Sequence, residues 1–356
     1  MTFRSIQWHD GAVRMLDQRL LPHQKVYHDY NDPYAVAEAI RAMVIRGAPA
    51  IGAAAAYGLA LVPRHAASDD ADAVRKELHA AAAALRAARP TAVNLSWAID
   101  RMMARLSDPA LDSVQALAQA ALAAANAIAA EDVAMNKAIA RNAMPLVPQG
   151  ATIIHHCNTG SLATVDYGTA LGVIRMAHEA GKGVFALVDE TRPRLQGARL
   201  TAWELKEYGV PFKIIVDSAS GRFMRRGEVD LCVVGADRIA ANGDTANKIC
   251  TYNLAVVARE NGVPFYVVAP TTTIDMNTAT GDDIPIEERP AREITHVGEC
   301  QVAPDDVAVA NPAFDVTPAP YITAIITEKG VVYPPFAENL ARLLNSPTAG
   351  LPRRDR

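Results

Sequence analysis

The sequence predicts an α/β protein: a Rossmann-like parallel sheet domain preceded by a smaller, mainly helical N-terminal domain that carries a short β-hairpin. Three observations support this class. Alanine-rich segments with charges at helical spacing fill the N-terminal part, β-branched runs alternate with helical segments after it, and Pro145 and Pro148 separate the two patterns. We therefore expect domains at residues 1–145 and 146–356, a division that suits a chain of 356 residues.

The N-terminal region begins with residues 3–19, which alternate around Asp10 and Gly11, a dipeptide that supplies the positive φ angles of a tight turn. This pattern predicts a β-hairpin. Asp32 and Pro33 suit the start of a helix, because the carboxylate accepts from free amides and proline already has the helical φ. That helix should reach about residue 44, and packed alanine-rich helices are predicted over residues 68–88 and 109–142.

A sharp corner carrying Arg46, Gly47 and Ala48 breaks the first helix and starts a second, with Pro49 in its first turn. Small residues there let a ligand approach amides at a helix N-terminus, where the dipole and the arginine both favour an anion. The alternative is an ordinary turn between helices with a solvated arginine, and the pattern alone slightly favours it. Arg89, in a later loop between helices, is a second candidate anion contact.

After the two prolines, short apolar runs alternate with helical segments, which predicts right-handed βαβ crossovers and a parallel sheet covered on both faces. No GxGxxG motif follows any run and no Walker A motif is present, so we expect no dinucleotide, nucleoside triphosphate or other cofactor. Residues 271–311 are too polar for a core and are typical of a lid or a partner surface. Strands are predicted near residues 151–156, 184–189, 212–216, 230–235, 264–269 and 321–326, and a last helix near 336–344.

The first of these strands ends at Cys157, where β-branched residues give way to small polar ones. Ligands bind at the carboxyl ends of parallel strands and loop amides suit an anion, so this position favours a thiol presented to a substrate phosphate. A free cysteine is more often a small buried hydrophobe, but one just past a strand end can be held as a thiolate. His155 and His156 alternate across the strand, and without a third ligand at suitable spacing we expect no metal.

Asp237 follows the fourth strand, and we expect it to meet Cys157 in one crevice. Its upstream run is apolar, and a carboxyl in such surroundings would be protonated near neutral pH and serve as a general acid. Asn247 and Lys248 are predicted in a turn that leads into a helix, where they would orient and neutralise a phosphate or hydroxyl. A solvated lysine is the alternative. Gln196, at a helix start after the second strand, is a weaker candidate of the same kind.

Composition narrows the function classes. Half of the residues are apolar, the net charge is −4 and the basic residues are scattered, so a small-molecule ligand is favoured over nucleic acid. The N-terminus has no apolar core after a basic start and charges interrupt each alanine-rich stretch, so we expect a cytoplasmic protein without a membrane span. The four cysteines lie far apart without CxxC spacing, which argues against a zinc ribbon or a disulfide framework.

With these residues identified, the chain resembles the methylthioribose-1-phosphate isomerase family almost from end to end. The resemblance implies an aldose–ketose isomerisation of 5-methylthioribose 1-phosphate to 5-methylthioribulose 1-phosphate in methionine salvage, by a homodimer. Cys250, where the family usually has glycine, and His155, often threonine there, depart from the pattern. The matching blocks are Arg46-Gly47-Ala48-Pro49-Ala50-Ile51-Gly52, Arg89-Pro90-Thr91-Ala92-Val93-Asn94-Leu95, His156-Cys157-Asn158-Thr159-Gly160, Asp189-Glu190-Thr191-Arg192-Pro193-Arg194-Leu195-Gln196-Gly197, Gly235-Ala236-Asp237-Arg238-Ile239 and Asn247-Lys248-Ile249.

Carried over by position, the resemblance implies that Cys157 and Asp237 form the catalytic pair. It assigns substrate contacts to Arg46, Gly47, Ala48, Arg89, Gln196, Asn247 and Lys248.

Two other kinds of protein share the fold. A ribose 1,5-bisphosphate isomerase would need extra basic partners for its second phosphate, and apolar residues around Trp97 favour a thioether instead. A regulatory subunit of the translation-initiation nucleotide-exchange factor would bind without catalysis and would have no need of both Cys157 and Asp237. The isomerase of methylthioribose 1-phosphate is therefore the favoured interpretation.

Overall fold

The structure is a computed structural model that describes residues 3–90 and 92–345. The chain divides into two compact units, one of residues 1–134 and 159–168, the other of residues 135–158 and 169–356. This division falls inside a continuous helix, α5 (Val114–Ala143), whereas the boundary predicted from the prolines follows the end of that helix. A proline indicates where a helix ends. The sequence has no comparable signal for the point within α5 at which the helix stops packing in one unit and begins to pack in the other.

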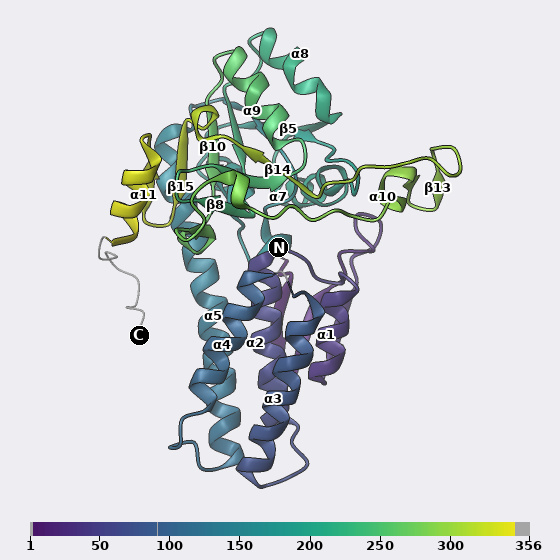
Figure 1. The fold of residues 1–356 in the computed structure, drawn as a ribbon, viewed down its shortest axis with the longest axis vertical. Coiled ribbons are helices and arrows are strands. Elements are labelled where there is room, and N and C mark those ends of the chain that lie inside the picture. The colour runs from purple at the N-terminus through teal and green to yellow at the C-terminus, as the bar shows by residue number, and fades with distance from the viewer. Residues whose placement is uncertain (1–2, 91, 346–356) are drawn as a thin grey trace. The chain divides into compact units, whose positions relative to one another are not determined.

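The first unit contains a three-stranded antiparallel sheet and a group of packed helices (Figure 1). The predicted hairpin is confirmed, with Asp10 at φ 48° and Gly11 at φ 83°, and a third strand extends it. The predicted helix start is also confirmed, since the Asp32 carboxylate accepts from the Ala35 amide. The elements are β1 (Ile6–His9), β2 (Ala12–Leu16), β3 (Tyr27–Tyr30), α1 (Pro33–Arg41), α2 (Ala48–Arg64), α3 (Ala71–Ala88), α4 (Val93–Leu106) and the N-terminal part of α5.

Helix α2 is the centre of this unit, because it contacts α1, α3 and α4 and is almost entirely buried. Its alanines and glycines allow that close approach. Gly58, for example, would place a Cβ 3.1 Å from Val36 Cγ1 if it were substituted. Alanine-rich sequence here therefore reflects close packing of helices rather than a membrane span. Along the described residues, no helix is both long and apolar enough to cross a membrane.

The second unit is built on a seven-stranded sheet of order β16-β15-β10-β7-β4-β5-β6, parallel except for β16. The predicted strands are confirmed to within a few residues, and with them the predicted fold class. The elements of the sheet and its cover are β4 (Thr152–His155), α6 (Ala170–Glu179), β5 (Phe185–Asp189), α7 (Ala202–Tyr208), β6 (Phe212–Ile215), α8 (Ser220–Arg225), β7 (Leu231–Val234), α9 (Thr251–Glu260), β10 (Phe265–Val268), β15 (Ala324–Thr327), β16 (Gly330–Val332) and α11 (Phe336–Asn345).

Alternate residues of each strand enter two separate cores, one on each face of the sheet. Ile153 of β4 packs with α6, α7 and the end of α5, while its neighbour Ile154 packs with α8, α9 and α11. Both faces are thus covered by helices, as the near-continuous apolar runs predict for parallel strands. The polar ends of the strands are left as the place where a ligand can be bound.

Smaller elements follow β7 and extend from the main sheet. A second sheet has the order β11-β8-β9-β14, and an arm bears a two-stranded hairpin (Figure 1). These elements are β8 (Arg238–Ala240), β9 (Thr245–Lys248), β11 (Ile274–Asp275), β14 (Phe314–Thr317), α10 (Arg292–Thr295), β12 (His296–Val297) and β13 (Cys300–Gln301). Single turns are η1 (Met144–Leu146), η2 (Ser161–Ala163), the π-type η3 (Gly197–Thr201), η4 (Asp217–Ala219), η5 (Thr271–Thr273), η6 (Gly281–Asp283) and η7 (Ala319–Tyr321).

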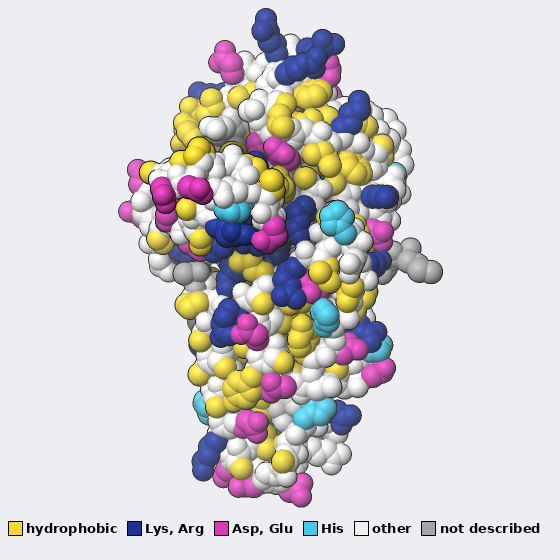
Figure 2. All heavy atoms as spheres, turned by 90° about the vertical axis from the view of Figure 1, so that its right-hand side faces the viewer, with side chains coloured by type: hydrophobic (Ala, Val, Ile, Leu, Met, Phe, Trp, Pro, Cys, Tyr) yellow, Lys and Arg dark blue, Asp and Glu magenta, His cyan; other side chains and the backbone are white. Residues whose placement is uncertain are grey.

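Charged side chains of both signs are interspersed over the face drawn in Figure 2. A nucleic-acid surface would instead gather basic residues into one continuous patch. This face therefore has no such patch among the described residues, in keeping with the scattered basic residues of the sequence.

Candidate active site

The order of the strands places Cys157 and Asp237 at the ends of neighbouring strands. From β4 the chain proceeds to β5 and β6 on one side of the sheet, and from β7 to β10 and β15 on the other. The β4–β7 pair is therefore the point at which the strand order reverses, and His155 pairs with Val233 across it. Ligands of open α/β sheets bind outside the carboxyl ends of strands at such a switch point. Cys157 follows β4 and Asp237 follows β7.

Cys157 is held firmly by its backbone. Its amide donates to Thr191 Oγ1 at 2.9 Å, and its carbonyl accepts from Thr201 Oγ1 at 2.7 Å. Its φ of 69° turns the chain sharply out of the strand, a conformation that is costly for a residue with a Cβ. The residue is only 6% exposed, so the thiol is largely buried in this structure, and its presentation to a substrate stays a prediction. The two threonines belong to the segment after β5, and these contacts between strand ends leave no trace in the local sequence.

Asp237 has the opposite character. Its side chain is exposed, although the strand before it is fully buried. The expected apolar environment of the carboxyl is therefore absent in this structure, because the chain leaves the sheet core at Gly235, before the aspartate is reached. The Asp237 amide donates to the Ala246 carbonyl at 2.9 Å, which fixes the backbone at the start of the small second sheet.

Asn247 and Lys248 lie on a strand, β9, rather than in a turn before a helix as the sequence predicted. Strands β8 and β9 form a hairpin around Asn242 and Gly243, and that Asn-Gly dipeptide, with Gly243 at φ 91°, is the signal that could have revealed it. The hairpin pairs Arg238 with Ala246. It therefore brings the backbone of Asp237 beside that of Asn247.

The polar ends of these two side chains are already engaged. Asn247 is buried and its Nδ2 donates to Thr251 Oγ1 at 2.9 Å. Lys248 Nζ donates to the Ala313 carbonyl at 2.6 Å and lies 4.4 Å from the centre of the Phe314 ring. A lysine ammonium has three donors, so Lys248 keeps donors for an anion while one hydrogen bond fixes its position.

Gln196 precedes η3 in the segment after β5. Within the described residues its Oε1 is buried without a hydrogen-bond partner. An unpaired buried acceptor costs free energy, so a donor from a ligand would be favoured there. Its neighbour Gly197 is required by space, because a Cβ there would lie 1.7 Å from the Asp189 carbonyl oxygen. The loop is thus pressed against the end of β5.

The remaining candidates belong to the first unit. Gly47 is the N-cap of α2 with φ 102°, and a Cβ there would lie 2.3 Å from the Ala163 carbonyl oxygen. Arg46 is half-buried, and Ala48 is exposed at the first position of the helix. The corner therefore lies against the η2 turn, which follows Cys157 in the chain. Arg89 is half-buried at the C-cap of α3.

Sequence reasoning missed a cluster formed by His156, which precedes Cys157, together with Asp189 and Asp217. One possible metal-ligand atom from each of the three side chains lies within 4.8 Å of the others. Both ring nitrogens of His156 already contact protein oxygens, and the two oxygens of Asp217 accept the amides of Thr191 and Arg192. These groups come from three strand ends distant in sequence, so no spacing rule could have found them. Their hydrogen bonds make the cluster a structural support of the loop rather than an open cation site.

The polar segment 271–311 is not a plain loop but an arm fastened to the segment after β5. Arg192 donates to the Ile294 carbonyl at 3.0 Å, and Arg194 pairs with Glu293 at 2.8 Å. Glu293 is also paired with Arg289 at 2.7 Å. The interpretation of this segment as a lid or partner surface stays a prediction.

The geometry of the second unit is that of a ligand site at a switch point, and comparison with known proteins identifies its class. The initiation factor 2 subunit family matches residues 44–334, so the chain belongs to that family. Among curated relatives, methylthioribose-1-phosphate isomerase 2 of Pseudothermotoga lettingae is 59% identical over 97% of this chain and 99% of its own length. This similarity confirms the resemblance predicted from the sequence blocks.

Two solved structures have the same fold. The 5-methylthioribose 1-phosphate isomerase from Pyrococcus horikoshii is 46% identical with a TM-score of 0.93, covering 96% of this chain and 95% of that one. The translation initiation factor eIF-2B, subunit delta, from A. fulgidus is 43% identical with a TM-score of 0.91, covering 97% of this chain and 100% of that one. The predicted architecture is therefore confirmed. One of these structures is named as an isomerase and the other as a translation initiation factor subunit, so the fold alone does not decide between these two functions.

Proposed function

We propose that this chain is an aldose–ketose isomerase that converts 5-methylthioribose 1-phosphate to 5-methylthioribulose 1-phosphate, a step of methionine salvage. The phosphate on the anomeric oxygen keeps the sugar closed, so the bond between C1 and the ring oxygen must break during the reaction. In the net change the ring oxygen gains a proton, one hydrogen moves from C2 to C1, and the C2 hydroxyl loses its proton as the ketone forms. The reaction therefore needs a proton donor for the ring oxygen and a route for the hydrogen between C2 and C1.

The observation that carries the proposal is the placement of Cys157 and Asp237 at the ends of the two strands that flank the switch point. Asp237, when protonated, would donate to the ring oxygen and later take the proton of the C2 hydroxyl. Cys157 would move hydrogen at carbon or stabilise the charge that develops there. A hydride shift from C2 to C1 is the alternative for the carbon step.

The exposure of Asp237 in the free protein is compatible with this role, because the bound sugar would shield the carboxyl from water. A bound substrate displaces water from the carboxyl, and loss of water disfavours the charged form. We propose Gln196, Asn247 and Lys248 as substrate contacts of the second unit. In the first unit we propose Arg46, Gly47, Ala48 and Arg89, where a helix N-terminus and guanidinium groups suit an anion. These contact roles are proposals that follow from the residue types and their positions.

The deciding experiment is incubation of the purified chain with each candidate sugar phosphate, with the ketose product followed by NMR. We expect turnover of 5-methylthioribose 1-phosphate and little or none of ribose 1,5-bisphosphate, because a second phosphate would need further basic partners. Turnover of neither, together with binding to initiation factor 2, would overturn the proposal and favour the role named for the A. fulgidus relative.

Solvent deuterium distinguishes the two carbon mechanisms. Deuterium at C1 of a product formed in heavy water supports proton transfer through an exchangeable group such as the Cys157 thiol. Complete retention of a C2 label in the product supports the hydride shift, which would limit Cys157 to stabilising charge.

We also propose that the chain acts in the cytoplasm as a homodimer without a resident cofactor or metal. Analytical ultracentrifugation of the purified chain tests the dimer, with a monomer of 38.0 kDa as the contrary result. Full activity after dialysis against a chelator tests the absence of a metal.

A further inference from the structure

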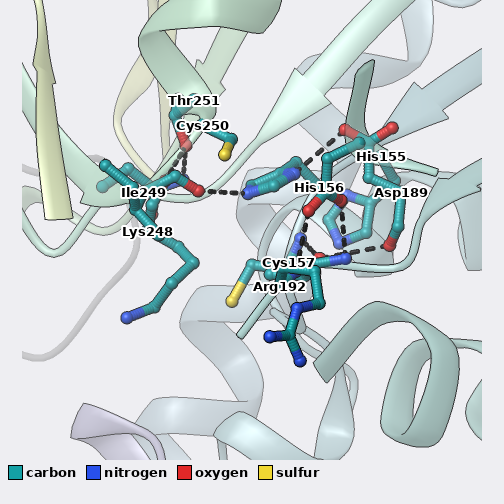
Figure 3. Close-up of polar contacts among 12 residues, drawn as sticks. His155, His156, Cys157, Asp189, Arg192, Lys248, Ile249, Cys250 and Thr251 are labelled. Carbon is teal, nitrogen blue, oxygen red and sulfur yellow. Dashed lines mark hydrogen bonds and ion pairs between the residues drawn. The ribbon is translucent and has the colours of Figure 1, made fainter. Parts of the chain in front are cut away.

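His156, the residue before Cys157, makes two hydrogen bonds from a completely buried ring. Nδ1 lies 2.9 Å from Asp189 Oδ2, and Nε2 lies 2.9 Å from the Ile249 carbonyl oxygen (Figure 3). A carbonyl oxygen can only accept, so Nε2 must carry a proton. A carboxylate also only accepts, so an ionised Asp189 requires a proton on Nδ1 as well. We name this pair of hydrogen bonds the His156 bridge.

The neighbouring histidine provides a contrast. His155 is equally buried on the other side of the strand, where its Nδ1 faces the Val233 carbonyl at 2.9 Å. Burial lowers the pKa of His155 to about 4, so that ring is neutral. For His156, burial acts in the same direction, but the hydrogen bond and charge of Asp189 and the charge of Asp217 outweigh it and raise the pKa. Burial raises the pKa of Asp189 to about 6, which leaves it ionised at neutral pH.

The groups around His156 favour a cation. Asp189 lies at the end of β5 and Asp217 follows β6, while Asp315 of β14 accepts the Cys250 amide at 2.7 Å. The field of His156 in turn favours the ionised form of Asp315, although burial raises the pKa of that carboxyl to about 6. Other titratable or charged groups on the segments that supply these contacts include His155, Cys157, Glu190, Arg192, Lys248 and Cys250.

The His156 bridge joins the two parts of the candidate site. One end of it is continuous with Cys157, whose amide is held by Thr191 two residues after Asp189. The other end holds Ile249, the residue next to Lys248. In the view of Figure 3 the side chains of Cys157 and Lys248 extend to the same side of the bond between His156 and Ile249. The bridge therefore connects the segment of the thiol to the segment of Lys248, the proposed phosphate contact.

We propose that His156 is a positioning residue of the isomerase, a doubly protonated imidazole that fixes the turn after β9 against the end of β4. This role rests on the proposed function. Loss of either ring proton would leave a ring nitrogen and an oxygen facing each other as two acceptors. That hydrogen bond would be lost, and the turn after β9 would no longer be held in place. The bridge is thus complete below the raised pKa of His156 and is lost as the pH rises through that pKa.

The first test observes the ring directly and needs no activity. Nitrogen-15 NMR of the wild-type chain labelled at histidine, with His155→Asn and His156→Gln used for assignment, reports the protonation of each ring nitrogen. We expect protons on both nitrogens of His156 at pH 7.5 and one proton on His155. A neutral His156 ring, with its Nδ1 unprotonated beside a protonated Asp189, would overturn the proposal.

The second test measures the role in turnover. We expect His156→Gln to lower kcat/KM by about 100-fold, the cost of a misplacement of about 1 Å, while His155→Asn stays within a few-fold of wild type. Equal activity of the two variants, with wild-type turnover intact, would overturn the positioning role and leave the proposed function standing. Absence of turnover in the wild type would instead count against the proposed function, and the NMR result would still decide the protonation.

Should His156→Gln fail to fold, Asp189→Asn replaces it. Removal of the counter-charge should lower the pKa of His156, so the alkaline fall of kcat/KM should move down by about one pH unit or more. An unchanged alkaline limb in folded Asp189→Asn would contradict the proposal.

Discussion

The ends of β4 and β7 present their reactive residues in contrasting ways. Cys157 is buried, strained at φ 69° and tied through its backbone to two threonines of another loop. Asp237 is exposed, and its backbone is fixed through the Ala246 carbonyl. The thiol of Cys157 is therefore held in position in the free protein. The carboxyl of Asp237 faces solvent until a bound ligand displaces the water around it. The difference predicts which substitutions affect folding and which affect chemistry alone.

The largest expected effect is that of Asp237→Asn. The amide keeps the shape of the side chain but cannot donate the acid proton, so kcat should fall by about 10³-fold, within the range typical of general acid catalysis. Because the side chain is exposed, the free energy of unfolding should change by less than about 0.5 kcal/mol. Kinetics and urea denaturation of the same preparation measure both. A large loss of stability would contradict the contrast drawn between the two strand ends.

Cys157→Ala should lower kcat by about 100-fold or more, because the group that acts at carbon is lost. Unlike the Asp237 variant, it should also lower the free energy of unfolding, by about 1 kcal/mol, since a buried sulfur is removed. Cys232→Ala is the matched control, because that cysteine is also buried but lies within β7. Loss of turnover in the control equal to that of Cys157→Ala would assign the effect to packing.

Thr191→Val tests the backbone support of the thiol. Valine matches threonine in shape but leaves the buried amide of Cys157 without its acceptor, which should cost about 1–3 kcal/mol and reduce kcat by about 10-fold. Thr191→Ser keeps the hydroxyl and should retain most of the activity. Equal behaviour of the two variants in denaturation and kinetics would mean that this hydrogen bond does not position Cys157.

Cys250→Gly should have the smallest effect and the opposite sign. Cys250 adopts φ 83°, a conformation that glycine occupies freely, so the substitution should stabilise the chain by up to about 1 kcal/mol. Cys250→Ala keeps the Cβ and the strain, and should give no such gain. The denaturant midpoints of the two variants provide the measurement, and a gain for alanine equal to that for glycine would exclude backbone strain as the cause.

The sheet could be predicted well from the sequence because parallel strands buried on both faces appear as continuous apolar runs, as in 231–234. Cys157 and Asp237 could be identified in the same way, as residues just past strand ends. Their exposure could not, because burial at a strand end depends on loops such as that of Thr191 and Thr201. The His156 bridge escaped prediction for the same reason, since Asp189 and Ile249 reach His156 from distant segments.

The hairpin of β8 and β9 differs, because its Asn242-Gly243 turn is visible in the sequence, yet the residues after it suggest a turn before a helix. A short strand with few β-branched residues, such as Thr245–Lys248, gives a weak local signal, and its pairing with β14 stabilises it from outside. The consequence is that Asn247 and Lys248 have fixed strand geometry rather than the freedom of a turn.

The most direct measurement of the central claim is a crystal structure of the folded Asp237→Asn variant with 5-methylthioribose 1-phosphate bound. We expect Cys157 Sγ and the side-chain amide introduced at position 237 both to lie within about 4 Å of the sugar, on the atoms between the ring oxygen and C2. A sugar phosphate bound with either side chain in a separate cavity would contradict this claim.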